Sequence, residues 1–156
     1  MRGRLTELAT NAEESVALLQ FRLGEFSLAF ALEHVQSVMN ETPITPIPHV
    51  PRHVRGLMAL GQNAIPVLDL ARFFRLRPAK RDSEIRRVAW VQVGDFQACI
   101  RMPRETRIMR LDASGLKAID WPVEGRIGEY LLDAFETERE SGRVVDLAKV
   151  LESARV

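Results

Sequence analysis

Residues 23–32 read LGEFSLAFAL, and a similar stretch, VGDFQACIRM, occupies residues 93–102. In both, a glycine, an acidic residue and a phenylalanine follow one another, and Gly94 stands 70 residues after Gly24. A glycine and an acidic residue between two alternating apolar runs are typical of a β-hairpin turn. The sequence therefore predicts two equivalent β-hairpins, one near the start of the chain and one near its middle.

A second pair of matching segments follows the hairpins in the same order. Residues 67–74 read VLDLARFF and residues 144–151 read VVDLAKVL, at an offset of 77. Asp69 and Asp146 each precede an apolar run, where a carboxylate can accept the free amide hydrogens of a first helical turn. Helix capping accounts for both aspartates, so we do not assign them a catalytic role. The two ordered matches predict two copies of one structural unit.

Composition places the chain among compact globular proteins. It has 156 residues, of which 46% are hydrophobic and 28% charged, with a formal net charge of +1. We expect residues 1–15 to be partly disordered. No apolar run resembles a signal peptide or a membrane span, so we expect the protein to lie in the cytoplasm without inserting into a membrane. The single cysteine, Cys99, lies in an alternating apolar strand and is predicted to be a core residue.

Four prolines stand within residues 42–51. Proline fixes φ and removes a backbone donor, so this segment is predicted to be an extended surface connection. Residues 54–60 and 64–68 are apolar runs on either side of a Gly-Gln-Asn turn, which predicts a further hairpin. Pro66 favours an edge position or a bulge for its returning strand.

These segments together carry a family resemblance. The run TPITPIPHVPRHVRGLMAL over residues 42–60, followed by IPVLDL over residues 65–70, resembles the signature of CheW-like coupling domains. The first hairpin and residues 144–151 also resemble that family. The resemblance implies a mainly β, CheW-like fold over residues 16–151. In it, two SH3-like five-stranded β-barrel subdomains with short helices, about 16–74 and 86–151, are joined by a basic linker.

The resemblance also implies a function. Proteins of that family are non-enzymatic adapters that couple chemoreceptors to a histidine kinase, so the implied partners are the cytoplasmic tip of a receptor and the regulatory domain of the kinase. The resemblance places a receptor-binding groove at Val35, Val38, Gly56, Met58, Leu60 and Ile65. The alternative is that these apolar residues pack inside a barrel, as alternate residues of strands usually do.

Three departures from the family pattern concern charged positions. The family usually has Arg-Gly where this chain has Gly61 and Gln62, a glutamate where it has Ser37, and an aspartate where it has Pro103. Losing an acid and a base together removes contacts that fix a partner surface. We therefore expect a divergent adapter that binds receptors but binds the kinase weakly.

Other classes of function find less support in the sequence. There is no nucleophile elbow, no phosphate-binding glycine loop and no metal-ligand spacing on a continuous element, so we expect no catalysis, cofactor or metal. The strongest alternative is a nucleic-acid-binding protein that uses the basic run from Arg72 to Arg87. A solvated linker explains that run more simply, so we do not expect nucleic acid as a partner.

Overall fold

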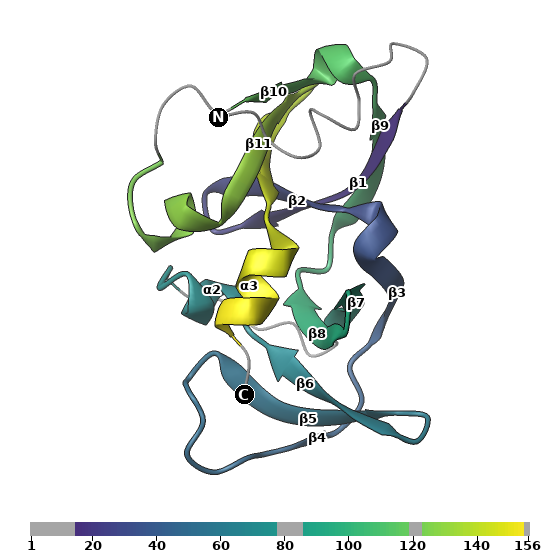
Figure 1. Cartoon of the computed structure of the whole chain (residues 1–156), viewed down its shortest axis with the longest axis vertical. Coiled ribbons are helices and arrows are strands. Elements are labelled where there is room, and N and C mark those ends of the chain that lie inside the picture. Colours follow the sequence, from purple (N-terminus) through teal and green to yellow (C-terminus); the bar gives the residue numbers. More distant parts are fainter. Residues whose placement is uncertain (1–14, 78–85, 119–122, 155–156) are drawn as a thin grey trace.

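The computed structural model describes residues 15–77, 86–118 and 123–154 (Figure 1). The expectation of disorder for residues 1–15 falls almost entirely outside this range, as do Lys80 and Arg81 of the basic run. The described part is mainly β, as predicted, with two sheets and two short α-helices. None of its helices is long and apolar enough to cross a bilayer.

Sheet A lies at the top of Figure 1 and sheet B at the bottom. In spatial order, the strands of sheet A are β10 (Leu116–Ala118), β11 (Leu131–Glu136), β12 (Ser141–Val145), β2 (Phe26–Ala31), β1 (Val16–Leu23) and β9 (Thr106–Leu111). Those of sheet B are β4 (Ile44–Thr45), β5 (Val54–Leu60), β6 (Asn63–Leu68), β8 (Phe96–Met102), β7 (Arg87–Val93) and β3 (Val35–Asn40). Each sheet thus has six strands, not five.

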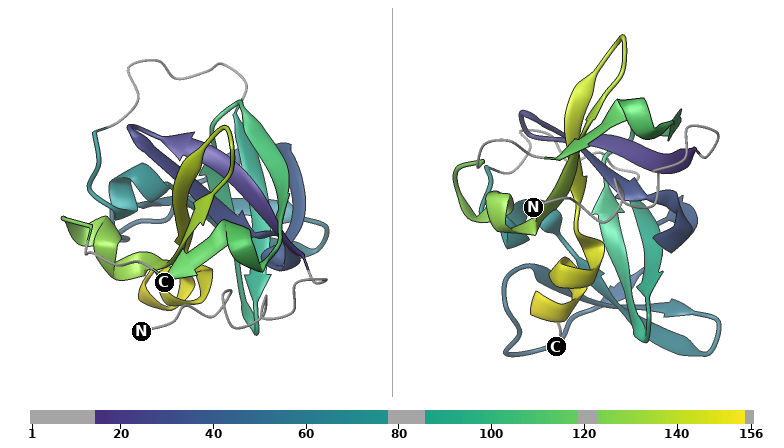
Figure 2. Two further views of the ribbon diagram at one scale, coloured as in Figure 1. Left: turned by 90° about the horizontal axis from the view of Figure 1, so that it is seen from above. Right: turned by 45° about the horizontal axis from the view of Figure 1, so that its top comes forward.

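The α-helices α2 and α3 lie near the middle of the molecule, between the two sheets (Figures 1 and 2). They span Leu70–Phe73 (α2) and Leu147–Ser153 (α3). Of the 3-10 helices, η1 (Leu32–His34) joins sheet A to sheet B, whereas η2 (Ala113–Gly115) and η3 (Arg126–Tyr130) precede strands of sheet A. Asp69 Oδ1 accepts from Arg72 N at 3.2 Å, and Asp146 Oδ1 accepts from Lys149 N at 3.1 Å. The predicted capping role of both aspartates is therefore confirmed.

The sheets exchange hairpins between the two sequence copies. Sheet A joins β1 and β2 of the first copy to β9–β12 of the second, while sheet B joins β7 and β8 to β3–β6. The predicted division into barrels of residues 16–74 and 86–151 therefore does not hold for the strand pairing. A sequence repeat shows which segments are equivalent, but it carries no information on which copy each hairpin joins.

The strand register follows the sequence offsets. β12 pairs with β2 in parallel through Val144 and Ala29, and β6 pairs with β8 through Val67 and Cys99, which are the equivalent positions. A β-bulge falls between Leu131 and Asp133 in β11 and between Val54 and Gly56 in β5, again 77 residues apart. The two copies therefore share these features of the backbone, whereas the bulge between Val35 and Ser37 in β3 has no counterpart in β9.

A shared core lies between the sheets, and each sheet covers a smaller cluster on its other face. The largest fully buried side chains of the shared core are Phe21, Phe30, Phe73, Phe74, Leu28, Leu70, Ile100, Ile127 and Leu147. Burying one such side chain contributes about 1.5–3 kcal/mol. Because both faces of the central strands are covered, alternate residues along them belong to different clusters.

The positions of Cys99 and Pro66 can also be compared with those predicted from the sequence. Cys99 is fully buried, as predicted, and its burial, helped by the Glu41 carboxylate, raises the pKa of its thiol to about 11. Pro66 lies on an interior strand, β6, not on an edge. The parallel pairing of β6 with β8 is short and is recorded at Val67 and Leu68, beyond the proline.

Candidate partner-binding surfaces

The six residues predicted to line a receptor groove do not share one surface. Met58 and Ile65 are 0% and 5% exposed and belong to the cluster that sheet B covers on its outer face, which half-buried Leu60 joins. Met58 and Ile65 therefore cannot contact a partner. The prediction failed for them because alternation marks two faces of a strand but does not say whether both are covered.

Gly56 is buried for a local reason. Its φ of 139° lies where side chains are disfavoured, and a Cβ atom would collide with the carbonyl oxygen of Thr45 and the Ile44 side chain. The glycine lets the short strand β4 approach the bulge of β5. Its role in this structure is close backbone packing.

Val35 and Val38 remain at the surface. They are half-buried on β3, an edge strand of sheet B, and pack partly against the shared core. The structure therefore separates the predicted groove into an edge pair on β3, half-buried Leu60 on β5, and three buried residues, Gly56, Met58 and Ile65.

The departures from the family pattern lie on three separate elements. Ser37 is half-buried on β3, opposite Trp90 of β7. Gly61 and Gln62 are exposed in the turn between β5 and β6, where Gly61 has a φ of 60°. Pro103 follows β8 and lines a hollow of about 650 Å³ with Arg107 and Glu140.

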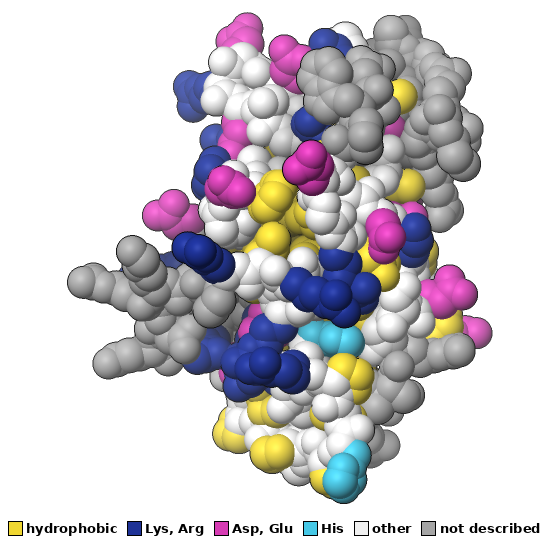
Figure 3. All heavy atoms as spheres, turned by 90° about the vertical axis from the view of Figure 1, so that its left-hand side faces the viewer, with side chains coloured by type: hydrophobic (Ala, Val, Ile, Leu, Met, Phe, Trp, Pro, Cys, Tyr) yellow, Lys and Arg dark blue, Asp and Glu magenta, His cyan; other side chains and the backbone are white. Residues whose placement is uncertain are grey.

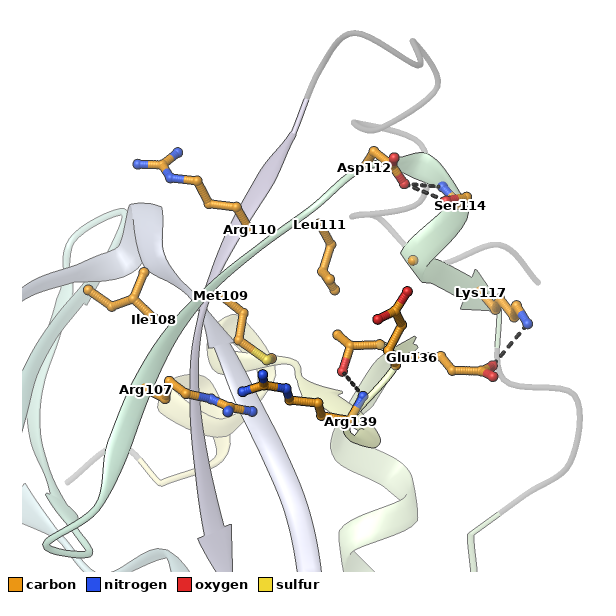
Figure 4. A pocket seen from close by; sticks show the side chains of 13 residues that line it. Arg107, Ile108, Met109, Arg110, Leu111, Asp112, Ser114, Lys117, Glu136 and Arg139 are labelled. Carbon is orange, nitrogen blue, oxygen red and sulfur yellow. Dashed lines mark hydrogen bonds and ion pairs between the residues drawn. The ribbon is translucent and has the colours of Figure 1, made fainter.

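The edge strand of sheet A carries an apolar side chain that the sequence prediction missed. Ile108 of β9 is 59% exposed, and among the described residues it is the large hydrophobic side chain that is exposed to solvent. Figure 4 shows Ile108 and Arg110 on one side of β9 and Met109 and Leu111 on the other. β9 pairs with β1 along one edge, and its other edge ends the sheet.

The side of β9 with Met109 and Leu111 borders a hollow of about 910 Å³. Its wall opposite β9 includes η2 and the β11–β12 turn, and that hairpin projects at the top of the right-hand view in Figure 2. Asp112 accepts from the hydroxyl and the backbone N–H of Ser114, and these bonds lower the pKa of its carboxyl. Lys117 and Glu136 form an ion pair at 3.0 Å across β10 and β11.

Glu140 fixes the β11–β12 turn to the neighbouring strands. Its carboxylate accepts hydrogen bonds from Gln20 Nε2 at 3.1 Å and Ser27 Oγ at 2.8 Å. Arg107 of β9 donates to its other oxygen at 3.1 Å, and Arg22 lies 3.5 Å away. These contacts hold the turn in place beside the β9 edge, which gives this end of sheet A a defined shape.

A signal for Ile108 was present in the sequence. Ile108 pairs with Leu19, and Val38 pairs with Ala89, and both pairs are related by the offset of 70. Applying the repeat to Val38, which was already a candidate, leads directly to Ile108. No group of three or more His, Cys, Asp or Glu side chains in the described residues could hold a metal ion.

Comparison with known proteins agrees with this geometry. A family model described as a CheW-like domain matches residues 17–155. Chemotaxis protein CheW of Treponema pallidum (strain Nichols) is 24% identical over 153 residues, which cover 96% of this chain and 89% of that protein. Protein FrzA of Myxococcus xanthus is 25% identical over 151 residues, with coverages of 95% and 92%.

The fold also matches a solved structure. The crystal structure of scaffolding protein TtCheW from Thermoanaerobacter tengcongensis has a TM-score of 0.73 at 18% identity, covering 85% of this chain and 89% of that one. Because the family model spans most of the sequence, the chain belongs to the CheW-like family. Proteins of this family are non-enzymatic scaffolds or adapters in chemotaxis signalling.

Proposed function

We propose that this protein is a cytoplasmic adapter that couples the tips of chemoreceptors to a CheA-type histidine kinase. Its membership of the CheW-like family supports the proposal. The observation that carries it in the structure is the pair of equivalent edge strands, β3 and β9, with apolar side chains at equivalent positions. An adapter needs two partner surfaces, and the two edges provide them.

The receptor tip is assigned to the β3 edge. A receptor tip is a helical hairpin, and a helix binds through spaced apolar residues on one of its faces. Val35 and Val38 offer two partly exposed apolar side chains on one edge strand. This retains the part of the predicted groove that lies on the β3 edge.

The kinase domain is assigned to the β9 edge. Ile108 stands exposed between Arg107 and Arg110, beside a turn that Glu140 holds in place. An apolar residue within a charged rim is a typical centre for a protein contact. Pro103 lines a hollow with Arg107 beside this edge and stands where the family usually has an aspartate, and for this reason we propose that kinase binding is weak.

A crossed titration tests both assignments. The two proteins titrated calorimetrically into the adapter are a receptor-tip fragment and the kinase regulatory domain from the same cell. We expect Val38→Gln to weaken receptor binding at least tenfold and Ile108→Gln to weaken kinase binding similarly, each leaving the other partner within about twofold. Each variant is therefore the control for the other, and thermal melts establish that both are folded.

The outcomes distinguish the claims. Folded wild-type protein that binds neither partner would contradict the adapter function, and equal losses in both variants would contradict the assignment of edges. The weak-kinase proposal has its own comparison, with the variant Pro103→Asp, which restores the acid next to Arg107. We expect this variant to bind the kinase domain more tightly than the native chain does, and equal affinities would refute the proposal.

A further inference from the structure

A hollow of about 650 Å³ beside α2 gathers positive charge from three distant segments of the chain. Arg52 and His53 come from the proline-rich connection, Arg72 and Arg75 from α2 and its end, and Arg126 from the start of η3. Figure 3 shows lysine and arginine side chains gathered near a histidine on this face. We call this the cationic hollow.

No carboxylate lines the cationic hollow among the described residues. Arg72 Nε lies 3.6 Å from Asp69 Oδ2, and within the described residues the other three arginines form no ion pair. The two hollows next to β9 differ, because Glu140 lines one and Glu136 the other, each paired with a basic residue. Guanidinium groups that converge without an acid repel one another unless an anion binds.

Neighbouring residues hold the Arg126 side chain in an orientation that can bind an anion. Its Nε donates to the carbonyl oxygen of Phe73 at 2.7 Å, and its guanidinium lies 4.6 Å from the Phe73 ring centroid and 5.4 Å from that of Tyr130. A guanidinium held through Nε and stacked on rings keeps its two terminal nitrogens for a ligand. Less rotational freedom is then lost when an anion binds.

Arg75 occupies a backbone position where glycine is usual. Its φ is 59°, its N–H donates to Arg72 O at 3.1 Å, and Leu76 N donates to Ala71 O at 2.8 Å. These two bonds form the Schellman motif that ends α2, in which the left-handed residue is most often glycine. An arginine kept in a disfavoured conformation indicates a use for its side chain.

His53 adds an unused polar atom beside these arginines. Its Nε2 is buried and has no hydrogen-bond partner in the described residues, while its ring packs edge-on against Phe73 at 5.1 Å. Burial and the Arg126 charge lower the pKa of this histidine, so the ring is neutral at pH 7. A neutral imidazole can still donate one hydrogen bond to an oxyanion.

We propose that the cationic hollow binds a small polyphosphate, either free pyrophosphate or the diphosphate of a nucleotide. Arginine forks match phosphate oxygens, and the volume lies in the range of small-molecule sites. An extended acidic protein segment fits less well, because the charges converge on one concavity that Phe73 and Leu76 also line. The inference is independent of the adapter function.

Calorimetric titration of the full chain with sodium pyrophosphate and with ADP, at fixed ionic strength, tests the proposal. We expect saturable one-site binding of pyrophosphate that the double variant Arg52→Gln and Arg75→Gln weakens at least tenfold. Both arginines are exposed, and neither side chain forms a hydrogen bond within the described part of the chain. The matched control, Arg110→Gln with Arg139→Gln, removes the same charge at another hollow and is expected to change affinity less than twofold.

The two probes separate the sources of the phosphate. ADP binding more tightly than pyrophosphate indicates a nucleotide, and the reverse order indicates the free anion. A lack of saturable binding by both probes would overturn the proposal, as would an equal loss in the control variant. A hexaglutamate peptide that binds more tightly than pyrophosphate would also overturn it in favour of an acidic protein segment.

Arg75→Gly provides a second test that misfolding cannot imitate. Glycine relieves the disfavoured φ, so this variant is expected to melt at a higher temperature than the native chain while binding pyrophosphate at least fivefold more weakly. A variant that is more stable and binds as tightly as the native chain would show that Arg75 has no role in the site.

Discussion

The edge strands β3 and β9 occupy equivalent places in the two sheets but face different surroundings. Val38 of β3 is half-buried against the shared core, whereas Ile108 of β9 is 59% exposed. The position of Ser37 in β3 corresponds to Arg107 in β9, which binds Glu140. The register of β3 matches that of β9 from Ser37 to Asn40 and departs from it at the bulge between Val35 and Ser37. The two proposed partner surfaces therefore differ in their side chains and at this bulge.

A second pair of equivalent positions shows the same divergence inside the protein. In sheet B, Arg101 holds Glu41 through two bonds of 2.9 and 3.1 Å, with both side chains largely buried. In sheet A, the equivalent residues are Ala31 and Leu111, which are part of an apolar cluster. One copy therefore uses an ion pair where the other uses an apolar contact.

The largest expected effect on stability concerns the β5 bulge, which has Gly56 where the equivalent bulge of β11 has Asp133. Gly56→Ala should destabilise the protein by about 3 kcal/mol or more, because the new Cβ meets the Thr45 backbone at a φ of 139°. Asp133, at the equivalent bulge, has no positive φ. Urea unfolding measures the loss. The control is Gly61→Ala, which has open space around it and should cost about 1 kcal/mol.

Loss of the Glu41–Arg101 ion pair should have the next largest effect on stability. Glu41→Gln leaves the buried Arg101 charge without its partner and should cost about 2 kcal/mol at pH 7. The double variant Glu41→Leu with Arg101→Ala copies the other sheet, and we expect it to recover at least half of that loss. If the double variant is less stable than Glu41→Gln, the two sites are not interchangeable and the comparison fails.

The two helix caps test equivalent positions with the same geometry. Asp69→Ala and Asp146→Ala should each lower the free energy of unfolding by about 1 kcal/mol, through loss of a bond of 3.2 or 3.1 Å to the backbone. Thermal melts with Asp→Asn as the conservative control measure this effect. Unchanged melts in both alanine variants would show that the caps contribute nothing.

The smallest expected effect depends on pH. His53 and Tyr130 are equivalent, since their carbonyls accept from Asp69 N and Asp146 N at 2.8 and 2.7 Å, and both rings contact Phe73. Burial and Arg126 lower the pKa of His53 in the folded state. Between that value and about 6.5 the unfolded chain binds more protons, so stability falls as pH decreases through this window.

Replacing the histidine isolates its contribution. His53→Tyr copies the other half of the molecule and should make the melting temperature less dependent on pH between 7.5 and 5.5. The loss in the native chain should be smaller than that caused by removing a helix cap. Identical pH profiles for the native chain and the variant would show that His53 titrates as it does in the unfolded state.

Local features of the fold were predictable from the sequence. Alternation and the Gly-acid turns predicted the hairpins, and Asp69 and Asp146 predicted the helix starts. Hairpin exchange was not predictable, because the contacts between β1 and β9 and between β3 and β7 join segments with no complementary pattern in the sequence. Local sequence rules predict a hairpin, but they do not predict which further strand pairs with it.

The burial of the candidate groove residues was predictable only in part, for a similar reason. Val35 and Val38 stay at the surface, whereas Met58 and Ile65 are interior because sheet B is covered on both faces. Periodicity separates the two faces of a strand but cannot say which face meets solvent. The cationic hollow was beyond prediction, because its arginines come from three segments that only the fold brings together.

Separate expression of the two halves tests the central claim that the copies exchange hairpins. Residues 15–77 and 86–156 are prepared as two polypeptides and melted alone and as an equimolar mixture, with circular dichroism as the probe. We expect no cooperative transition for either fragment alone, because each lacks the hairpin of its partner, and a single cooperative transition for a one-to-one complex. Cooperative unfolding of either fragment by itself would show that the copies do not depend on exchanged hairpins.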